Sequence, residues 1–303
     1  MKILVTGGLG FVGRHLVQEL RDRKDDVWLT GVHHDADPQY LRCDVGEYRQ
    51  VARIFENHKF DCVYHLAAEF GRWNGEDFYE TLWKSNVIGT KHMIRAQERH
   101  RFRMVFFSSS EVYGDWPGVM SEDVMDNYEI KQLNDYAMTK WVGEMQILNS
   151  VQTSQTETVR VRLFNVYGPG EPYSTYRSAL VRFIYSALHG LSYTVYANHT
   201  RSWLYIDDAI GALATIARNF KAREVYNIAS AEDVAMKQLS DAIIRLCKGN
   251  DKLVTVKSEE GMTTHHKKVD NSRAKRDLGL QANVPLEEGL RRTVKWMRET
   301  YGK

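Results

Sequence analysis

The sequence has little cysteine or proline and no long apolar run. Its 303 residues include 5 prolines and 3 cysteines, and Cys43, Cys62 and Cys247 form no C-x-x-C pair. An odd number of unpaired cysteines argues against a disulfide framework and against a thiolate metal site. No stretch approaches the ~20 apolar residues of a membrane-spanning helix, and the amino terminus lacks a secretory signal pattern. We therefore expect a soluble, cytoplasmic protein with no membrane partner.

An excess of one charge sign is also absent. The 41 basic and 39 acidic side chains leave a formal charge of +2, too balanced for a protein that mainly binds nucleic acid through its phosphates. The 11 histidines include no pair at metal-ligand spacing on a helix face, so we expect no metal. At 43% hydrophobic and 26% charged residues, the composition is typical of folded globular chains.

Strand and helix patterns alternate through the first half of the chain. The apolar, β-branched runs that we interpret as strands are residues 2–6, 27–33, 62–66, 104–109 and 159–164. Because parallel neighbours need a crossover connection, this alternation predicts an α/β fold with a doubly wound parallel sheet. We expect a cofactor-binding domain over residues 1–165 and a smaller α/β substrate lobe over 166–303, some segments of which return to the main sheet.

The lobe has a looser pattern. Helices are expected at residues 178–189, 207–219, 236–247 and 286–299, and strands at 193–196 and 225–228. Acidic residues dominate the earlier segment 115–135, which we interpret as a solvated connection or a lid.

A glycine-rich turn follows the first strand. The run Gly7-Gly8-Leu9-Gly10-Phe11-Val12-Gly13 leads directly into a helical segment. Glycines let the backbone turn tightly and approach a pyrophosphate, which the helix amino terminus then binds. The turn predicts a dinucleotide cofactor held by Gly7, Gly10, Phe11, Val12 and Gly13.

The choice between NAD and NADP stays open. An acidic residue about 20 positions further on marks NAD, and a basic one accommodates the extra phosphate of NADP. Counting from Gly13 reaches His33, which satisfies neither rule. Asp35 could replace the missing acid, His33 and His34 could line a phosphate pocket, or both histidines are ordinary loop residues. Asp44 is a candidate partner for the adenine amino group.

Two polar segments follow predicted strands at the sheet edge where open sheets bind ligands. The first is Ser108-Ser109-Ser110-Glu111, and the second contains Tyr136 and Lys140, four residues apart on a predicted helix. This spacing puts both side chains on one helix face. A phenol has a pKa of ~10, and a nearby cation such as Lys140 would favour the phenolate.

Together these motifs resemble the extended short-chain dehydrogenase/reductase family, with its Rossmann-like fold, and most of all its nucleotide-sugar epimerases and dehydratases. The residues that carry the resemblance are Thr6-Gly7-x-x-Gly10-x-x-Gly13, His65-Leu66-Ala67-Ala68, Asn86, the serine run and Tyr136-x-x-x-Lys140. It continues through Arg162-Leu-Phe-Asn165-Val-Tyr167-Gly-Pro169 and Arg201-Ser-Trp-Leu-Tyr205-Ile-Asp207-Asp208 and so covers nearly the whole chain.

The resemblance implies an enzyme that oxidises a nucleoside-diphosphate hexose at carbon 4 and then dehydrates it, with tightly bound NAD or NADP regenerated. Tyr136 is the implied base, Lys140 tunes it, and Ser109 binds the same sugar oxygen. Glu111 would take a proton from carbon 5, unless it only caps a turn. Ser110 stands where some 4,6-dehydratases have an acid. The implied cofactor-binding residues are Gly7, Gly10, Phe11, Val12, Gly13, His33, Asp44, Val45, Leu66, Ala67, Ala68, Asn86, Tyr136 and Lys140.

Alternative functions remain open at this point. A 4-epimerase would use the same ketone. A decarboxylase is disfavoured, because such enzymes share an arginine that faces the sugar carboxylate, and the matching segment here is His265-His266-Lys267-Lys268. A non-catalytic NAD(P)-sensing protein is the remaining alternative.

Substrate contacts and assembly are also implied by the resemblance. The expected substrate-binding residues are Asn165, Arg201, Arg177 and Lys267, which would meet the diphosphate unless Arg201 is a surface ion pair. The helix that follows Tyr136 has an excess of apolar residues. This suggests a homodimer, or, as the competing explanation, burial of the helix against the second lobe of the same chain.

Overall fold

The computed structural model describes residues 1–302 of the chain, which form two compact units. The first unit contains residues 1–112, 134–163 and 210–226, and the second contains 113–133, 164–209 and 227–303. The functional division at residues 165/166 stays a prediction. Within the described residues, no helix is long and apolar enough to span a bilayer.

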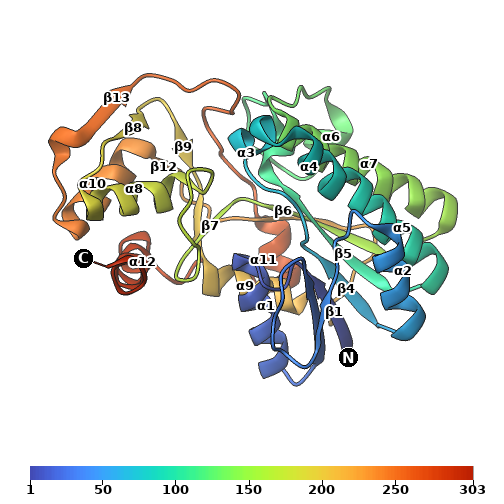
Figure 1. The fold of residues 1–303 in the computed structure, drawn as a ribbon. Helices are drawn as coiled ribbons and strands as arrows, with labels where there is room; N and C mark the ends of the chain where they lie inside the picture. Colours follow the sequence, from blue (N-terminus) through green and yellow to red (C-terminus); the bar gives the residue numbers. More distant parts are fainter. Residues whose placement is uncertain (303) are drawn as a thin grey trace. The chain divides into compact units, whose positions relative to one another are not determined.

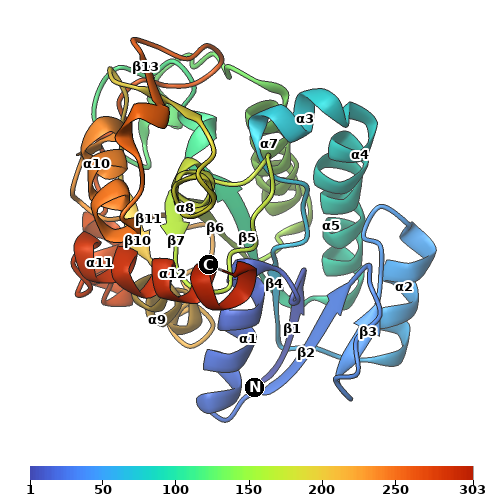
Figure 2. The same cartoon turned by 60° about the vertical axis from the view of Figure 1, so that its left-hand side comes forward.

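A seven-stranded sheet, in the order β11-β6-β5-β4-β1-β2-β3, organises the first unit. Every pair from β6 to β3 is parallel, and Figure 2 shows β4, β1, β2 and β3 side by side. The strands are β1 (Lys2–Thr6), β2 (Asp26–Gly31), β3 (Tyr40–Arg42), β4 (Cys62–His65), β5 (Arg103–Ser109), β6 (Thr158–Leu163) and β11 (Val225–Ile228). The predicted fold class is confirmed, and the nearly continuous burial along β1, β4, β5, β6 and β11 suits a sheet covered on both faces.

Helices cover both faces of this sheet (Figure 1). One face packs on α2 (Tyr48–Asn57), α5 (Gly89–His100) and α7 (Asp135–Ser154), which share a buried apolar core with β1, β4 and β5. The other face carries α1 (Phe11–Asp22) and the last residues of α9 (Ile206–Thr215). The shorter helices are α3 (Arg72–Asp77), α4 (Tyr79–Trp83) and the π-helix η1 (Lys84–Ile88).

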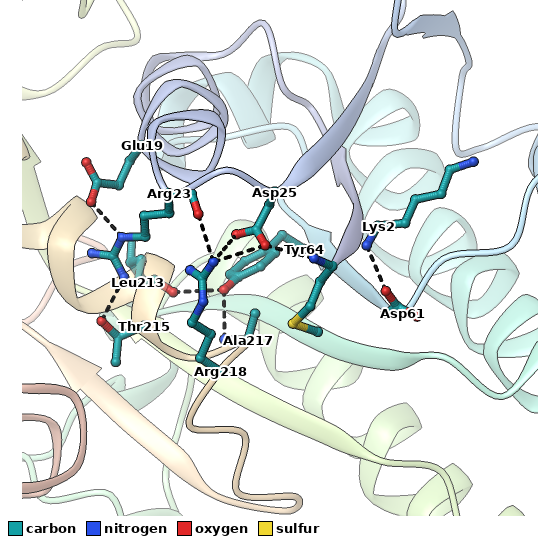
Figure 3. A network of polar contacts seen from close by, with 11 residues as sticks. Lys2, Glu19, Arg23, Asp25, Asp61, Tyr64, Leu213, Thr215, Ala217 and Arg218 are labelled. Atoms are coloured by element: carbon teal, nitrogen blue, oxygen red, sulfur yellow. Dashed lines mark hydrogen bonds and ion pairs between the residues drawn. The ribbon is translucent and has the colours of Figure 1, made fainter.

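A polar network joins α1, β4 and the segment after α9 inside the first unit (Figure 3). The buried Tyr64 hydroxyl donates to the Leu213 carbonyl and accepts the Ala217 N–H, both at 3.0 Å. Arg23 on α1 donates to the Thr215 hydroxyl at 3.1 Å. These bonds pair polar groups that would be costly to leave unsatisfied, and they fix residues 211–217 against the sheet.

The second unit is built from short strand pairs and three packed helices. Strands β7 (Asn165–Tyr167) and β10 (Trp203–Tyr205) are parallel, as are β8 (Tyr193–Tyr196) and β13 (Val254–Lys257), whereas β9 (Thr200–Arg201) and β12 (Val234–Ala235) are antiparallel. Helix α10 (Met236–Cys247) packs against α8 (Ala179–His189) and α12 (Leu286–Tyr301). The remaining elements are η2 (Ser110–Tyr113), α6 (Val124–Asn127), η3 (Asp251–Leu253) and α11 (Ser272–Leu278).

The interpretation of residues 115–135 as a solvated acidic connection is wrong for one of its acids. Glu122 is only 4% exposed and accepts the Asn227 N–H at 2.9 Å. Asn227 in turn accepts a hydrogen bond from the Tyr113 hydroxyl at 2.7 Å. Burial raises the pKa of Glu122, although the Asn227 N–H and the Arg273 charge oppose that shift. Local acidity could not reveal this, because the partners are more than 100 residues away.

Candidate functional site

The glycine turn has the geometry of an anion cradle. Gly7 has a φ of 69°, and a Cβ there would lie 2.9 Å from the Ala67 nitrogen. A Cβ on Gly13 would lie 2.3 Å from the Gly7 carbonyl oxygen, so a side chain at either position would clash. Helix α1 begins at Phe11 with no acidic residue in its first turn, and no side chain in residues 1–302 caps it at Gly10. Its first N–H groups therefore fit a pyrophosphate.

Strand β2 ends without an acidic residue. The Gly31 carbonyl, at the end of this strand, accepts the Tyr40 hydroxyl at 2.7 Å. Both nearby carboxylates have internal partners: Asp35 accepts the Asp37 N–H at 2.9 Å, and Asp37 pairs with Arg21 at 2.6 Å. The hydrogen bond from Arg21 holds the pKa of Asp37 below its usual value.

An arginine and two histidines, Arg42, His33 and His34, lie at this loop. The exposed Arg42 donates through Nε to the Val32 carbonyl at 3.0 Å, and its Nη1 lies 3.1 Å from Nε2 of His34. His33 is also exposed, and its carbonyl accepts the Tyr40 hydroxyl. Val32 and Arg42 line a cleft of about 840 Å³ that continues toward α2.

Asp44 and Val45 lie at the next strand end. Asp44 accepts the Gly46 N–H at 2.8 Å, and its other oxygen lies 3.4 Å from Nζ of Lys84. Val45 is buried, and its carbonyl is 2.9 Å from Nδ1 of His92. Only the Asp44 carboxylate is placed to reach outward from this pair.

A buried histidine connects β1 to α5. Nδ1 of His65 lies 2.9 Å from the Thr6 hydroxyl, and Nε2 lies 3.3 Å from the Thr90 hydroxyl. Thr6 also accepts the Ala67 N–H at 3.1 Å. Burial, with a smaller effect of the Lys140 charge, lowers the pKa of His65 to about 3, so its ring is neutral. It fixes the start of the loop of Leu66, Ala67 and Ala68 beside the glycine turn.

Asn86 holds the same loop from the other side. Its Oδ1 accepts the Glu69 N–H at 2.8 Å, and its Nδ2 donates to the Glu69 carbonyl at 3.1 Å and to Thr139 at 3.0 Å. The amide therefore links the loop after β4 to α7. A direct cofactor contact by Asn86 stays a prediction.

The structure brings Tyr136, Lys140 and Ser109 together. Asn134 caps α7 with its side-chain oxygen and so starts the helix just before Tyr136. Nζ of Lys140 donates to the Phe107 carbonyl at 2.9 Å and lies 5.9 Å from the centre of the Tyr136 ring. The Ser109 hydroxyl lies close enough to the Tyr136 phenol to lower its pKa.

Burial dominates the titration of this pair. It raises the pKa of Tyr136 to about 12, with the Ser109 hydrogen bond opposing the shift and the Glu111 charge adding to it. Burial also lowers the pKa of Lys140 to about 8. The lowering of the phenol pKa that we expected from Lys140 is not seen in the protein alone, where burial raises this pKa instead.

Glu111 lies beside the phenol. Its N–H donates to the Ser109 hydroxyl at 3.2 Å, and its carboxylate is 3.5 Å from Nδ2 of Asn134. Its charge acts on Tyr136, so the two side chains are close. Ser110, before it, is only 3% exposed. The Tyr136 phenol, the Ser109 hydroxyl and the Glu111 carboxylate thus lie together at the carboxyl end of β5.

A further carboxylate lies deeper under the site. Glu144 on α7 is fully buried and accepts the Ser108 hydroxyl at 2.6 Å. It also accepts two bonds from Arg162 and one from Arg160, each at 2.9 Å. Among residues 1–302, no group of three or more His, Cys, Asp or Glu side chains is arranged to hold a metal.

Comparisons with known proteins agree with this geometry. The sequence model of the NAD dependent epimerase/dehydratase family matches residues 3–229. This chain belongs to that family. It is therefore an enzyme of a family that contains nucleotide-sugar epimerases, dehydratases and decarboxylases.

Individual relatives of this family member differ in activity. A UDP-N-acetyl-alpha-D-glucosaminuronate decarboxylase of Bacillus cytotoxicus is 28% identical, over 98% of each chain. The dTDP-glucose 4,6-dehydratase 1 of Escherichia coli is also 28% identical, over 98% of this chain and 92% of its own. The solved UDP-glucose 4-epimerase of Thermotoga maritima is 25% identical over 99% of both chains, with a TM-score of 0.90. MoeE5, solved with UDP-glucuronic acid and NAD, is 26% identical over 99% and 100%, with a TM-score of 0.86.

The residues of this family member that we expect to bind the substrate lie in the second unit, and two of them have defined hydrogen-bond partners. Asn165 donates to the Ser202 carbonyl at 3.3 Å. Arg201 donates to the His265 carbonyl at 3.0 Å and to the Thr263 hydroxyl at 3.1 Å. Arg201 therefore holds the 263–265 loop.

The other two candidates are less accessible than the sequence suggests. The charge of Arg177 opposes a burial effect that raises the pKa of Glu171 to about 7, so these two groups are close. Lys267 is only 1% exposed. A role for Lys267 at the diphosphate stays a prediction.

Sequence reasoning assigned no role to Glu144 or Arg160 and named Arg162 only within the motif that carries the family resemblance. The signal that could have found Glu144 is spacing, because it follows Lys140 by four residues and shares its helix face. Arg160 and Arg162 lie within β6, where no local pattern indicates their partner on α7.

The lowered pKa of Lys140 predicts a pH-dependent contribution to stability. Between about pH 8 and its ordinary value near 10.5, Lys140 is charged in the unfolded chain and neutral in the folded one. The unfolded chain binds more protons there, so stability from this group rises with pH and is lost as pH falls. In denaturant unfolding, the free energy of unfolding of the wild type should rise relative to that of Lys140→Met by up to ~1.4 kcal/mol for each pH unit.

The difference between the two proteins removes contributions that both share, including that of Tyr136. A constant difference from pH 8 to pH 10 would contradict the assignment.

Proposed function

We propose that the protein oxidises a nucleoside-diphosphate hexose at carbon 4 and removes water across carbons 5 and 6. The observation that supports this most is the position of Glu111, a carboxylate beside the Tyr136–Ser109 pair. A 4-epimerase needs only the base and the hydroxyl, whereas dehydration needs a second base for carbon 5. The dinucleotide, when bound, accepts a hydride from the sugar and later returns it.

Tyr136 and Ser109 act on the sugar oxygen at carbon 4. Ser109 donates a hydrogen bond to this oxygen, and the Tyr136 phenolate takes its proton as a ketone forms. A phenol with a pKa of about 12 is a weak source of phenolate at neutral pH. Positive charge near the ring must therefore increase on ligand binding, and Lys140, 5.9 Å from the ring centre, is the resident cation.

Glu111 acts on the neighbouring carbon. The ketone acidifies the hydrogen at carbon 5, and Glu111 takes that proton. Hydroxide then leaves carbon 6 and departs as water with the proton that Glu111 has gained. Ser110 supplies at most a hydrogen bond, because its hydroxyl is too weak an acid to protonate the leaving group. Carbon 6 then receives the hydride that carbon 4 gave up, and carbon 5 receives a proton that balances the one Tyr136 took from the oxygen at carbon 4. One water is lost, and the cofactor would end unchanged.

Asn165 and Arg201 are proposed to bind the diphosphate, with Arg177 and Lys267 as weaker candidates. A guanidinium matches two phosphate oxygens at once. Arg201 would have to exchange its bonds to Thr263 and His265 for bonds to phosphate.

Epimerisation at carbon 4 is the second candidate. It is favoured by the similarity to the Thermotoga maritima UDP-glucose 4-epimerase, whose solved structure holds UDP-glucose. Decarboxylation ranks third: the relative from Bacillus cytotoxicus is a decarboxylase, but residues 265–268 here are His-His-Lys-Lys.

The cofactor is proposed to be NADP in preference to NAD, and to stay bound because the reaction regenerates it. No acidic residue ends β2, and Asp35 and Asp37 are engaged within the loop. Arg42 and His34 are placed beside that loop and suit an additional phosphate. The family is NAD-dependent by name, and MoeE5 was solved with NAD. The proposed preference for NADP therefore rests on the residues of this chain alone.

A homodimer through α7 is proposed as well. Met138, Met145 and Leu148 are exposed along one side of this helix. An apolar stripe of this kind on a surface helix fits a second copy of the chain, and the molar mass in solution tests it.

Glu111→Gln is predicted to separate the two steps of the reaction. With a panel of uridine, guanosine, cytidine and thymidine diphosphate sugars, the wild type should form a 4-keto-6-deoxy product, 18 mass units lighter as loss of one water requires. Glu111→Gln should lower dehydration by ~10²-fold or more while the oxidised sugar still forms, because general base catalysis contributes ~10²–10⁴. Tyr136→Phe should abolish both steps.

Mass spectrometry of the sugar checks this prediction. An inverted hydroxyl without loss of water would support the epimerase, and loss of carbon dioxide the decarboxylase. Full dehydration by Glu111→Gln would contradict the role of Glu111.

Arg42→Ala is predicted to weaken NADP binding about tenfold and to change NAD binding less than about twofold, because only NADP carries the additional phosphate. Calorimetric titration of the cofactor-free protein measures both affinities. Arg49→Ala, which removes an exposed arginine from α2, is the matched control. Tighter binding of NAD than NADP by the wild type would contradict the preference.

A further inference from the structure

The site rests on a buried charged cluster that no step of the proposed reaction uses. Glu144 is 0% exposed, Arg162 1% and Arg160 5%. The carboxylate of Glu144 receives four hydrogen bonds, three from the two guanidiniums at 2.9 Å and one from Ser108 at 2.6 Å. All four lie within the length expected of charge-assisted bonds.

Ionisation of this cluster follows from its contacts. Burial alone would raise the pKa of Glu144, but the charges and hydrogen bonds of Arg162 and Arg160, with Ser108, hold it below the usual value. Both arginines are charged at all ordinary pH values. One carboxylate between two guanidiniums leaves a net positive charge inside the core, so no polar atom of Glu144 is dispensable.

The helix face of Glu144 is that of the catalytic side chains. Tyr136, Lys140 and Glu144 follow one another at intervals of four residues along α7. Such spacing stacks the three side chains on one face, over successive turns.

Each of these side chains contacts a different one of three consecutive residues on β5. Lys140 donates to the Phe107 carbonyl at 2.9 Å, and Glu144 accepts the Ser108 hydroxyl. The Ser109 hydroxyl lies beside the Tyr136 phenol and lowers its pKa. The end of β5 and one face of α7 are thus joined at three neighbouring points, of which only Tyr136–Ser109 meets the substrate.

We propose that Glu144 is a positioning residue: through its bond to Ser108 and its pairs with Arg160 and Arg162, it sets α7 against β5 so that Tyr136 meets Ser109. A one-residue strand step is about 3.3 Å, so a small slip of the helix would break the catalytic hydrogen bond. Misplacements near 1 Å are enough to cost large factors in rate. The kinetic arm of this proposal rests on the proposed function, whereas the structural arm does not.

Ser108→Ala tests the proposal with the least disturbance. It removes one hydrogen bond to Glu144 and leaves both arginine pairs in place, so the protein should fold. Ser150→Ala is the matched control, because Ser150 lies on the same helix, is 1% exposed and donates to Glu98 at 2.8 Å. Each variant loses a serine–glutamate bond of α7, and Ser150→Ala also loses the bond that Ser150 accepts from Thr156 at 3.1 Å. Only Ser108 adjoins the site.

The kinetic arm compares kcat, KM and pH profile. Ser108→Ala should lower kcat about tenfold with KM within about twofold of the wild type. The acidic limb of its kcat profile should move to higher pH, because a weaker Ser109 hydrogen bond no longer lowers the Tyr136 pKa as much. Ser150→Ala should keep the wild-type kcat and profile even where its melting temperature falls equally.

The structural arm needs no turnover. Crystal structures of the wild type and both variants should show the Ser109 and Tyr136 hydroxyls further apart in Ser108→Ala and unchanged in Ser150→Ala. If the wild type converts no sugar, the proposed function fails and this comparison still decides on Glu144. A wild-type distance between the two hydroxyls in Ser108→Ala, or identical kinetics of the two variants, would overturn the proposal.

Discussion

The contact between one face of α7 and the end of β5 is the constraint on which the site depends. Ser109 on β5 and Tyr136 and Lys140 on α7 come from segments some 30 residues apart. The position of the helix along the strand decides whether these side chains meet. Lys140 and Glu144 fix that position by bonds to a backbone carbonyl and to a serine hydroxyl. The Asn134 cap fixes where the helix begins and reaches toward Glu111 as well.

Burial gives these groups their chemistry and also limits it. The same desolvation raises the pKa of Tyr136 and lowers that of Lys140, so both tend toward their neutral forms in the protein alone. Catalysis by a phenolate then requires a ligand that brings positive charge or removes water to the benefit of the anion.

The sequence predicted what depends on local pattern, and it failed where distant partners decide. Apolar runs predict the strands of the main sheet. Glycines predict the turn, because a Cβ at these positions would clash with the backbone. Strands such as β9 and β12 have two residues each, too few for a pattern. The burial of Glu122 and Arg162 was hidden because their partners lie 105 and 18 residues away. The family resemblance implied a base at Tyr136, and spacing placed Lys140 on the same helix face, but the raised pKa of Tyr136 depends on its surroundings.

The most direct test of this account is a crystal structure of the protein with its dinucleotide and a nucleotide sugar that it accepts. The account predicts that the Tyr136 hydroxyl and the Ser109 hydroxyl both lie within hydrogen-bond distance of the oxygen on carbon 4 of the sugar, with the Glu111 carboxylate facing carbon 5. A sugar whose carbon 4 oxygen is bound by other groups, with the Tyr136 phenol directed away from it, would contradict the account.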